Sequence, residues 1–272
     1  MQIANKVILV TGGASGIGRG LCERFAREGA KGVCVADVDD TAGQQVAAAI
    51  GGKYIHCDVG DEAQVQRAIA ETEAQFGPID LYVSNAGIAF RDAGGLVAGS
   101  SNADWTKIWE VNLMAHVYAT RALLPAMIAR GSGYFLITAS AAGLLNQVGS
   151  AAYSVTKHAA VGFAESLAIT HGEQGIGVSV FCPQGVWTNM TRWVKESPKG
   201  ADAMMQPAEV AETVVQALAE ERFLIVSHAQ TKEYLQRKAA DYDGWIRGMQ
   251  RYRTKLREQA RGQGRDRSLA GS

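Results

Sequence analysis

The sequence predicts an α/β fold: a doubly wound, parallel, seven-stranded sheet between two layers of helices. Seven short apolar runs alternate with helical segments along the 272 residues, and such alternation is typical of parallel βαβ units. Several runs, such as VILV, VCVA and FLIT, lack alternating polar residues, as strands buried on both faces do. No repeat and no Pro- or Ser-rich linker divides the chain. Residues 1–230 are therefore expected to form one three-layer α/β/α domain, with residues 231–272 as a helical extension.

The strand segments are short and rich in β-branched and aromatic residues, which favour strands. The first, KVILV, runs directly into glycines, and the second, GVCVAD, ends in an aspartate. The later ones, KYIHC, IDLYVSN, GYFLITAS, GVSVFC and FLIV, each follow a helical segment. The strands are expected at residues 6–10, 32–37, 53–57, 79–85, 133–140, 177–182 and 223–226.

The helical segments carry apolar residues three or four positions apart. In the first, Ile17, Leu21 and Phe25 show this spacing, and the second is rich in Ala and Gln. The helices are expected at residues 16–28, 40–50, 61–76, 103–130, 152–173 and 207–220.

The composition excludes several classes of protein. Hydrophobic residues make up 47% and charged residues 20%, which provides a large buried core and excludes a disordered chain, a coiled coil and a disulfide-rich miniprotein. The 27 Lys and Arg balance 27 Asp and Glu, which argues against nucleic acid or another polyanion as the main partner.

The sequence favours a cytoplasmic protein. It has no run of about 18 apolar residues that would span a membrane, and its start lacks the basic segment and cleavage site of a signal peptide. The four cysteines have apolar neighbours, so buried, reduced thiols are favoured over disulfides or a metal site. They are Cys22, Cys34, Cys57 and Cys182.

A glycine-rich turn, TGGASGIG at 11–18, joins the first strand to the first helix. Such a turn lets the backbone approach a pyrophosphate, and the helix N-terminus offers free N–H groups to it. Asp37 ends the second strand, 19 residues beyond Gly18, where a dinucleotide-binding fold has an acid that bonds the adenosine ribose. The spacing is GxxxGxG rather than GxGxxG, and the alternative is a solvated glycine loop with a helix-capping aspartate.

Asp37 also favours NAD over NADP. The 2′-phosphate of NADP would meet a like charge there, and neither Ser15 nor Val38 offers a compensating cation. Arg19 is close in sequence but is expected inside the first helix.

Three further residues have the chemistry of a proton-transfer site. Ser140 ends the fifth strand, at the sheet edge where ligands bind in doubly wound folds. Tyr153 and Lys157 are four residues apart, which places them on one face of a helix. A lysine beside a phenol lowers the phenol pKa and makes it usable as a general acid or base. Alone, the Tyr-Lys spacing also fits an amphipathic surface pair.

With these motifs in this order, the sequence resembles the short-chain dehydrogenase/reductase family, in its single-domain branch. The resemblance covers about residues 4–228 and implies a Rossmann-like fold. The residues that carry it are TGGASGIG (11–18), Asp37, Asp58, Val59, NAG (85–87), Asn112, Ser140, YSVTK (153–157) and PQGVWT (183–188).

The resemblance implies roles for four catalytic residues. Tyr153 would transfer the proton to or from the substrate oxygen, Lys157 would lower its pKa and bond the nicotinamide ribose, and Ser140 would orient the carbonyl or alcohol. Asn112 would hold a water that links Lys157 to solvent, the alternative being a helix-kinking or core amide. Hydride would move between nicotinamide and the carbinol carbon, so no metal is required.

The resemblance also implies an NAD site along the carboxyl edge of the sheet. The residues expected to line it are Gly12, Ser15, Gly16, Ile17, Gly18, Asp37, Asp58, Val59, Asn85, Ala86, Gly87, Tyr153, Lys157, Pro183, Val186 and Thr188. Two positions depart from the family pattern. Gln184 stands where Gly is usual, so its side chain is expected to enter the substrate pocket or contact nicotinamide, and Ser84 replaces an Asn.

Apolar and aromatic residues follow Ser140 and Thr188, which suits a hydrophobic secondary alcohol or ketone. Hydroxysteroids, terpene alcohols and aryl carbinols all fit, and packing in the core or an interface is the alternative for each residue. An NADP-dependent ketone reductase and a non-catalytic dinucleotide sensor are the alternative functions. The expected substrate-binding residues are Ser140, Leu144, Gln147, Tyr153, Gln184, Trp187 and Trp193.

The extension is basic and amphipathic. Residues 232–272 hold eleven Lys and Arg against five Asp and Glu, and apolar residues between 235 and 256 recur at helical spacing. One or two helices are expected, ending in a disordered GQGRDRSLAGS. Such a helix can bind a membrane surface or nucleic acid, but packing against its own domain or a partner subunit is favoured. The resemblance implies a homotetramer or dimer, built partly from the helices at 103–130 and 152–173.

Overall fold

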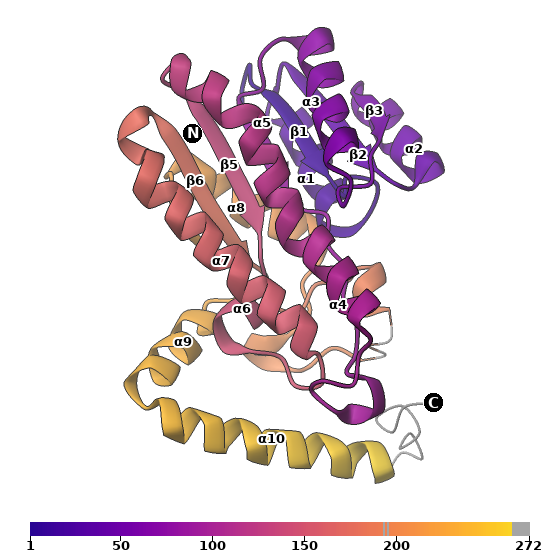
Figure 1. Cartoon of the computed structure of the whole chain (residues 1–272), viewed down its shortest axis with the longest axis vertical. Coiled ribbons are helices and arrows are strands. Elements are labelled where there is room, and N and C mark those ends of the chain that lie inside the picture. The colour runs from indigo at the N-terminus through magenta and orange to yellow at the C-terminus, as the bar shows by residue number, and fades with distance from the viewer. Residues whose placement is uncertain (193, 195, 263–272) are drawn as a thin grey trace.

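The computed structural model describes residues 1–192, 194 and 196–262. All seven strands of the described chain are parallel and form one sheet in the order β3-β2-β1-β4-β5-β6-β7 (Figure 1). The predicted doubly wound α/β sheet is confirmed, because the strand order reverses direction between β1 and β4. The strands are β1 (Val7–Thr11), β2 (Gly32–Asp37), β3 (Lys53–His56), β4 (Leu81–Ser84), β5 (Gly133–Thr138), β6 (Ile176–Cys182) and β7 (Leu224–Val226).

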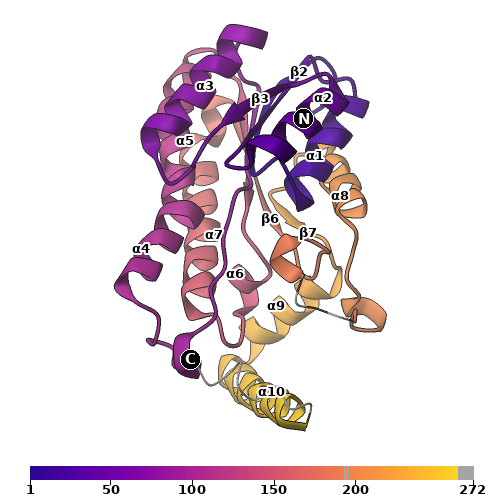
Figure 2. The ribbon, with the colours of Figure 1, turned by 90° about the vertical axis from the view of Figure 1, so that its right-hand side faces the viewer.

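Helices cover both faces of the sheet (Figure 2). One face packs against α3, α5 and α7 through residues such as Leu9 and Phe135. The other packs against α1, α2 and α8 through residues such as Ile8 and Leu136. The helices of this core are α1 (Gly16–Arg27), α2 (Asp40–Ile50), α3 (Glu62–Phe76), α4 (Asn102–Trp109), α5 (Ala115–Ala129), α6 (Ala142–Leu145), α7 (Ala151–His171) and α8 (Pro207–Ala219).

Two features between residues 102 and 145 differ from the prediction. The single helix expected at 103–130 is interrupted by a π-turn at Glu110–Met114, which separates α4 from α5. The short helix α6 follows β5, in a segment that was expected only as an apolar wall. Hydrophobic spacing does not distinguish a wider π-turn from an α-turn, and one turn of helix is too short to show a period.

The C-terminal extension forms two helices, as predicted: α9 (Gln230–Ala240) and α10 (Tyr242–Gly262). Helix α9 lies beside α6, and α10 crosses the same end of the molecule (Figures 1 and 2). The predicted disorder at 262–272 lies almost wholly outside the described residues. Among the described helices, none is long and apolar enough to span a membrane.

The sheet interior supplies a test of which contacts stabilise the fold. Leu9 is fully buried on β1, whereas Leu96 is 66% exposed in the loop before α4. Leu9→Ala is expected to lower the free energy of unfolding by about 2–5 kcal/mol, because the cavity adds to the lost burial. Leu96→Ala is expected to change it by less than about 0.5 kcal/mol. Urea unfolding followed by circular dichroism measures both, and equal losses would contradict this placement of the core.

Candidate active site

The turn between β1 and α1 brings the backbone into unusually close contact with neighbouring segments. Gly12 has φ +65°, and a Cβ atom there would lie 2.9 Å from the Cα of Ala86. A Cβ atom on Gly18 would lie 2.0 Å from the carbonyl oxygen of Gly12. Ser15, the N-cap of α1, makes no side-chain capping bond, which leaves N–H groups of the first turn available to an anion. The turn therefore has the properties of a phosphate-binding cradle.

Asp37 lies directly beside this cradle. Its Oδ2 accepts a hydrogen bond from the Ala14 N–H at 2.9 Å, and its Oδ1 accepts one from the Asp39 N–H at 3.1 Å. The structure thus brings the glycine turn and the acid at the end of β2 together, as predicted. These residues fit a dinucleotide, with the diphosphate at the turn and the adenosine ribose at Asp37.

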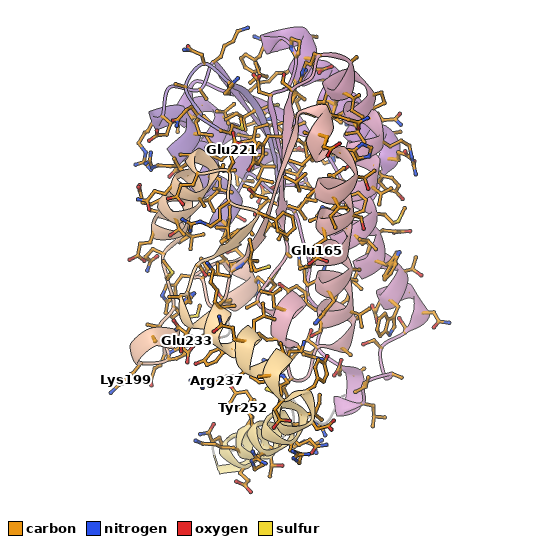
Figure 3. All side chains as sticks on the ribbon, turned by 90° about the vertical axis from the view of Figure 1, so that its left-hand side faces the viewer. Glu165, Lys199, Glu221, Glu233, Arg237 and Tyr252 are labelled. Atoms are coloured by element: carbon orange, nitrogen blue, oxygen red, sulfur yellow. The ribbon has the colours of Figure 1, made fainter. Side chains whose placement is uncertain are left out.

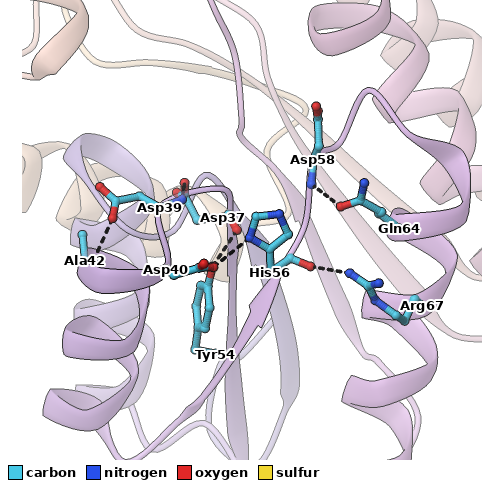
Figure 4. Close-up of polar contacts among 9 residues, drawn as sticks. All are labelled: Asp37, Asp39, Asp40, Ala42, Tyr54, His56, Asp58, Gln64 and Arg67. Atoms are coloured by element: carbon cyan, nitrogen blue, oxygen red, sulfur yellow. Dashed lines mark hydrogen bonds and ion pairs between the residues drawn. The ribbon is translucent and has the colours of Figure 1, made fainter.

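A second carboxylate group next to Asp37 was not predicted (Figure 4). Asp40 Oδ1 lies 2.6 Å from the Tyr54 hydroxyl and 2.7 Å from His56 Nδ1. The Tyr54 hydroxyl is also 2.9 Å from the Asp37 carbonyl oxygen. The hydrogen bond from Tyr54, and then that from His56, hold the pKa of Asp40 below its usual value. The sequence signal was the acidic run DVDD at 37–40, which keeps this corner negatively charged.

The NAG segment after β4 is fixed against the same turn. Asn85 Nδ2 donates to the Thr11 carbonyl at 3.0 Å. Thr11 Oγ1 accepts from the N–H groups of Asn85 and Ala86 at 3.0 and 3.2 Å, a role that the sequence analysis missed. A Cβ atom on Gly87 would lie 3.3 Å from Asn112 Oδ1 and 3.4 Å from Lys157 Nζ.

Ser84, just before this segment, pairs with a buried histidine. Its Oγ is 2.6 Å from His116 Nδ1. Burial, and to a smaller degree Lys157, lower the pKa of His116 to about 3, so this imidazole is neutral at physiological pH. His116 was not predicted to lie near the site.

Asp58 and Val59 follow β3, at the rim of the cradle. Asp58 accepts a hydrogen bond from Lys107 Nζ at 3.2 Å. Its N–H donates to Gln64 Oε1 at 3.0 Å (Figure 4). Val59 is buried. Asp58 is therefore held in place by an ion pair to α4 and a bond to α3.

Asn112 is fully buried in the π-turn. Its Oδ1 accepts from the Ile88 N–H and its Nδ2 donates to the Ile88 carbonyl, both at 2.9 Å, and Nδ2 also reaches Thr156 Oγ1 at 3.2 Å. The side chain thus joins the chain after β4 to α7. The water-binding role expected for Asn112 stays a prediction.

Tyr153 and Lys157 lie one turn apart on α7, and both are buried. Lys157 Nζ donates to the carbonyl oxygen of Thr138, the last residue of β5, at 2.9 Å, and lies 5.8 Å from the centre of the Tyr153 ring. Ser140 follows on the same strand end, and its Oγ accepts from the Ala142 N–H at 3.1 Å. The strand end therefore aligns all three side chains.

Burial is the main influence on the pKa values of Tyr153 and Lys157. It raises the pKa of Tyr153 above its usual value, and the hydrogen bond from Ser140 lowers it by less. It also lowers the pKa of Lys157 to about 8. Desolvation of the phenol therefore outweighs the hydrogen bond from Ser140. The lowering of the Tyr153 pKa by Lys157, expected from the sequence, stays a prediction.

Comparison with known proteins decides the family. The family described as short chain dehydrogenase matches residues 6–199. The chain belongs to the short-chain dehydrogenase/reductase family. Zerumbone synthase from Zingiber zerumbet is 34% identical over 250 residues, 81% of this chain and 90% of that protein. Secoisolariciresinol dehydrogenase from Forsythia intermedia is 37% identical over 194 residues, 69% of this chain and 68% of that protein.

A solved structure supports the same assignment. A short-chain dehydrogenase/reductase from Burkholderia phymatum, crystallised in complex with NAD, has a TM-score of 0.79 and 27% identity. The match covers 89% of this chain and 96% of that one. The chain is thus an oxidoreductase of a family that uses a nicotinamide dinucleotide.

In this short-chain dehydrogenase, the segment after β6 closes the other side of the site. The Pro183 carbonyl accepts from the Ala141 N–H at 2.8 Å. Val186 is buried and pairs with Met205. A Cβ atom on Gly16 would lie 2.9 Å from Thr188 Cγ2, so Thr188 lies at the phosphate-binding turn. Ile17 follows there on α1 and is half-buried.

Gln184, predicted on the substrate side, has both ends of its amide hydrogen-bonded, and its contact with substrate or nicotinamide stays a prediction. Its Nε2 donates to Asp202 Oδ1 at 2.7 Å, and its Oε1 accepts from Thr231 Oγ1 at 3.1 Å. The amide is therefore bonded at both ends to neighbouring polar groups. The complementary donor and acceptor of the amide make this arrangement favourable.

The other predicted substrate residues have varied surroundings. Leu144 is buried on α6. Trp187 is half-buried, and its backbone N–H donates to the Met205 carbonyl at 3.0 Å. Gln147 is exposed, and its N–H bonds Ser154 Oγ at 2.9 Å. Trp193 lies outside the described residues.

The buried ammonium of Lys157 predicts a pH dependence of stability. Its pKa is about 8 in the folded chain, against an ordinary value of 10.5. Between these two pH values the unfolded chain binds more protons, so stability rises with pH, by at most about 1.4 kcal/mol per pH unit. The difference in unfolding free energy between wild type and Lys157→Met should therefore grow in favour of wild type from pH 8 to 10. Urea titrations at several pH values measure it, and a flat difference would contradict the buried ammonium.

Proposed function

We propose that this protein is an NAD-dependent oxidoreductase that interconverts a hydrophobic secondary alcohol and its ketone, with Tyr153 as general acid/base. The observation that carries the proposal is the alignment of Ser140, Tyr153 and Lys157 at the end of β5. Gly87 lies beside them, since a Cβ atom there would be 3.4 Å from Lys157 Nζ. A bound nicotinamide dinucleotide would donate or accept the hydride. The protein residues then need to orient the substrate oxygen and transfer one proton.

Tyr153 is proposed to transfer that proton. Its raised pKa keeps the hydroxyl protonated near neutral pH, which is the form that donates to a ketone oxygen. Oxidation of an alcohol needs the phenolate and is expected to quicken as pH rises. Ser140 is proposed to donate to the substrate oxygen and Lys157 to bond the nicotinamide ribose, with Asn112 holding the Ile88 backbone beside them.

NAD is proposed over NADP on electrostatic grounds. Asp37 is accompanied by Asp39 and Asp40, whose carboxylates are also part of this corner (Figure 4). A 2′-phosphate would meet these like charges. The NAD bound in the Burkholderia phymatum structure supports the same choice.

The substrate class rests on the apolar segments beside Ser140 and Thr188. Leu144 and Leu145 are buried on α6, and Met204 and Met205 are half-buried in the segment after Thr188. These surroundings favour a hydrophobic alcohol. The relatives named as a dehydrogenase and a synthase are in keeping with an enzyme rather than a dinucleotide sensor.

A homo-oligomer is proposed for the assembly, with α5 and α7 in the interface. Val155 is 46% exposed and Ile169 84% exposed on α7, and burying them would be favourable. A cytoplasmic location remains part of the proposal; it is supported by the free, buried thiols of all four cysteines.

Tyr153→Phe tests the proposed acid/base. The variant is expected to lose at least about a hundredfold in kcat, because the proton acceptor is gone, while the Kd for NADH, measured by fluorescence titration, stays within about twofold. Tyr252→Phe, on the exposed face of α10, is the matched control. The assay is reduction of NAD in a screen of hydrophobic secondary alcohols. Turnover retained by Tyr153→Phe would exclude this role.

Asp37→Asn tests the cofactor choice. The amide keeps an acceptor for the Ala14 N–H but removes the charge, so the ratio of kcat/KM with NADP to that with NAD is expected to rise about tenfold or more. Asp243→Asn, which removes an exposed carboxylate from the first turn of α10, is expected to leave the ratio unchanged. A wild type that prefers NADP would refute the repulsion argument.

A further inference from the structure

Asp202 is the centre of a hydrogen-bond network that joins three distant parts of the chain. Its Oδ1 accepts from Gln184 Nε2 at 2.7 Å, after β6, and from Gln230 Nε2 at 3.2 Å, on α9. Its Oδ2 accepts from the Tyr234 hydroxyl at 3.2 Å, also on α9. Thr231 of α9 closes the network by donating to Gln184 Oε1 at 3.1 Å. Helix α9 thus bonds Asp202 through Gln230 and Tyr234, which lie one turn apart, and bonds Gln184 through Thr231.

Residues 200–205, next to Asp202, belong to the apolar segment after Thr188 that is proposed to border the substrate. We call residues 200–205 the methionine wall. Met205 exchanges backbone hydrogen bonds with Gly185 and Trp187, both at 3.0 Å. The imidazole of the buried His228, just before α9, lies with Nε2 2.7 Å from the Ala203 carbonyl. The position of this wall therefore depends on α9 and on the residues that precede it.

Helix α9 also contacts a second segment that is proposed to border the substrate. We call residues 140–147, which include Ser140 and α6, the serine wall. Lys238 is buried and donates to the Leu144 carbonyl at 2.6 Å, at the C-terminal end of α6. Its ammonium also lies 5.3 Å from the centre of the Tyr242 ring. A buried ammonium is costly unless it is well bonded, so this contact strongly fixes where α9 meets α6.

The outer face of α9 is different. Glu233 and Arg237 form an exposed ion pair at 3.9 Å (Figure 3), and Lys232 is exposed. Among the described residues, the hydrogen bonds of α9 to the two walls come from Gln230, Tyr234 and Lys238.

We propose that α9 is part of the substrate-binding apparatus, with Asp202 and Lys238 as positioning residues that fix the spacing between the methionine wall and the serine wall. This inference rests on the proposed function, because the walls are those of the alcohol site. Gln184 makes it specific to this chain: the glycine usual at that position has no side chain to bond Asp202. The network acts on the substrate, since the NAD-side residues Gly12, Gly18 and Asp37 take no part in it.

Two matched pairs of variants test the inference in the full-length protein with NADH bound. Tyr234→Phe removes one hydroxyl from the Asp202 network, and Tyr252→Phe removes one from the exposed face of α10 (Figure 3). Lys238→Met removes the bond to Leu144, and Lys232→Met removes an exposed ammonium from the same helix. Hydrogen–deuterium exchange read by mass spectrometry is expected to quicken at 185–187 and 202–205 in Tyr234→Phe, and at 142–147 in Lys238→Met. Neither control is expected to change these peptides.

Steady-state kinetics give the functional readout. With the alcohol that wild type oxidises best in the NAD-reduction screen, KM is expected to rise about fivefold in Tyr234→Phe and Lys238→Met, while kcat and the Kd for NADH stay within about twofold. Tyr234→Phe is expected to add nothing in an Asp202→Ala background, because both changes break one network. A merely structural role would instead lower thermal stability and active fraction without raising KM.

The outcomes separate the two proposals. Unchanged exchange in both walls, or a KM equal to that of the matched controls, overturns the inference even when wild type is active. A wild type that oxidises no alcohol in the screen refutes the proposed function. The exchange data then still decide whether α9 holds the two walls, since they need no turnover.

Discussion

The parallel direction of all strands is the constraint on which this structure depends. It places the residues that follow each strand at one edge of the sheet, so that segments far apart in sequence meet there. The segments at this edge are packed closely together. Gly12 and Gly18, for example, have no room for a Cβ atom. The residues that gather at the edge are Gly12, Asp37, Asp58, Asn85, Ser140 and Pro183.

The same edge explains why polar side chains can be buried beside it. Strand ends present backbone groups that have no further partner in the sheet. Lys157 uses one such group, the Thr138 carbonyl, and Asn112 uses both backbone groups of Ile88. Each bond offsets part of the cost of desolvation. The bonds also fix the side chains in place, so the groups that would transfer a proton need little reorganisation.

The sequence predicts most of this because the prediction rests on strong local signals. Apolar runs located all seven strands, and Gly12, Gly18 and Asp37 come together as the strand-to-helix turn requires. The remaining features depend on contacts between segments. Asn112, in the π-turn, bonds Ile88 and Thr156. The side chain of Gln184 is oriented by its partners Asp202 and Thr231. Tyr54 and His56 meet Asp40 because β3 lies beside β2. Spacing in sequence carries none of this information.

The extension shows how an overall charge of zero can hide two different parts of a chain. Residues 232–272 carry six more basic than acidic residues, so residues 1–231 carry the opposite excess. Yet among the described residues, the contacts of α9 with the core use this charge at the buried Lys238 alone, which bonds a carbonyl and not a carboxylate. The other hydrogen bonds join neutral donors of α9 to Asp202 and to Gln184. The attachment of α9 is therefore set by specific hydrogen bonds at the two walls and not by general attraction between a basic helix and an acidic core, so it is expected to persist at high salt.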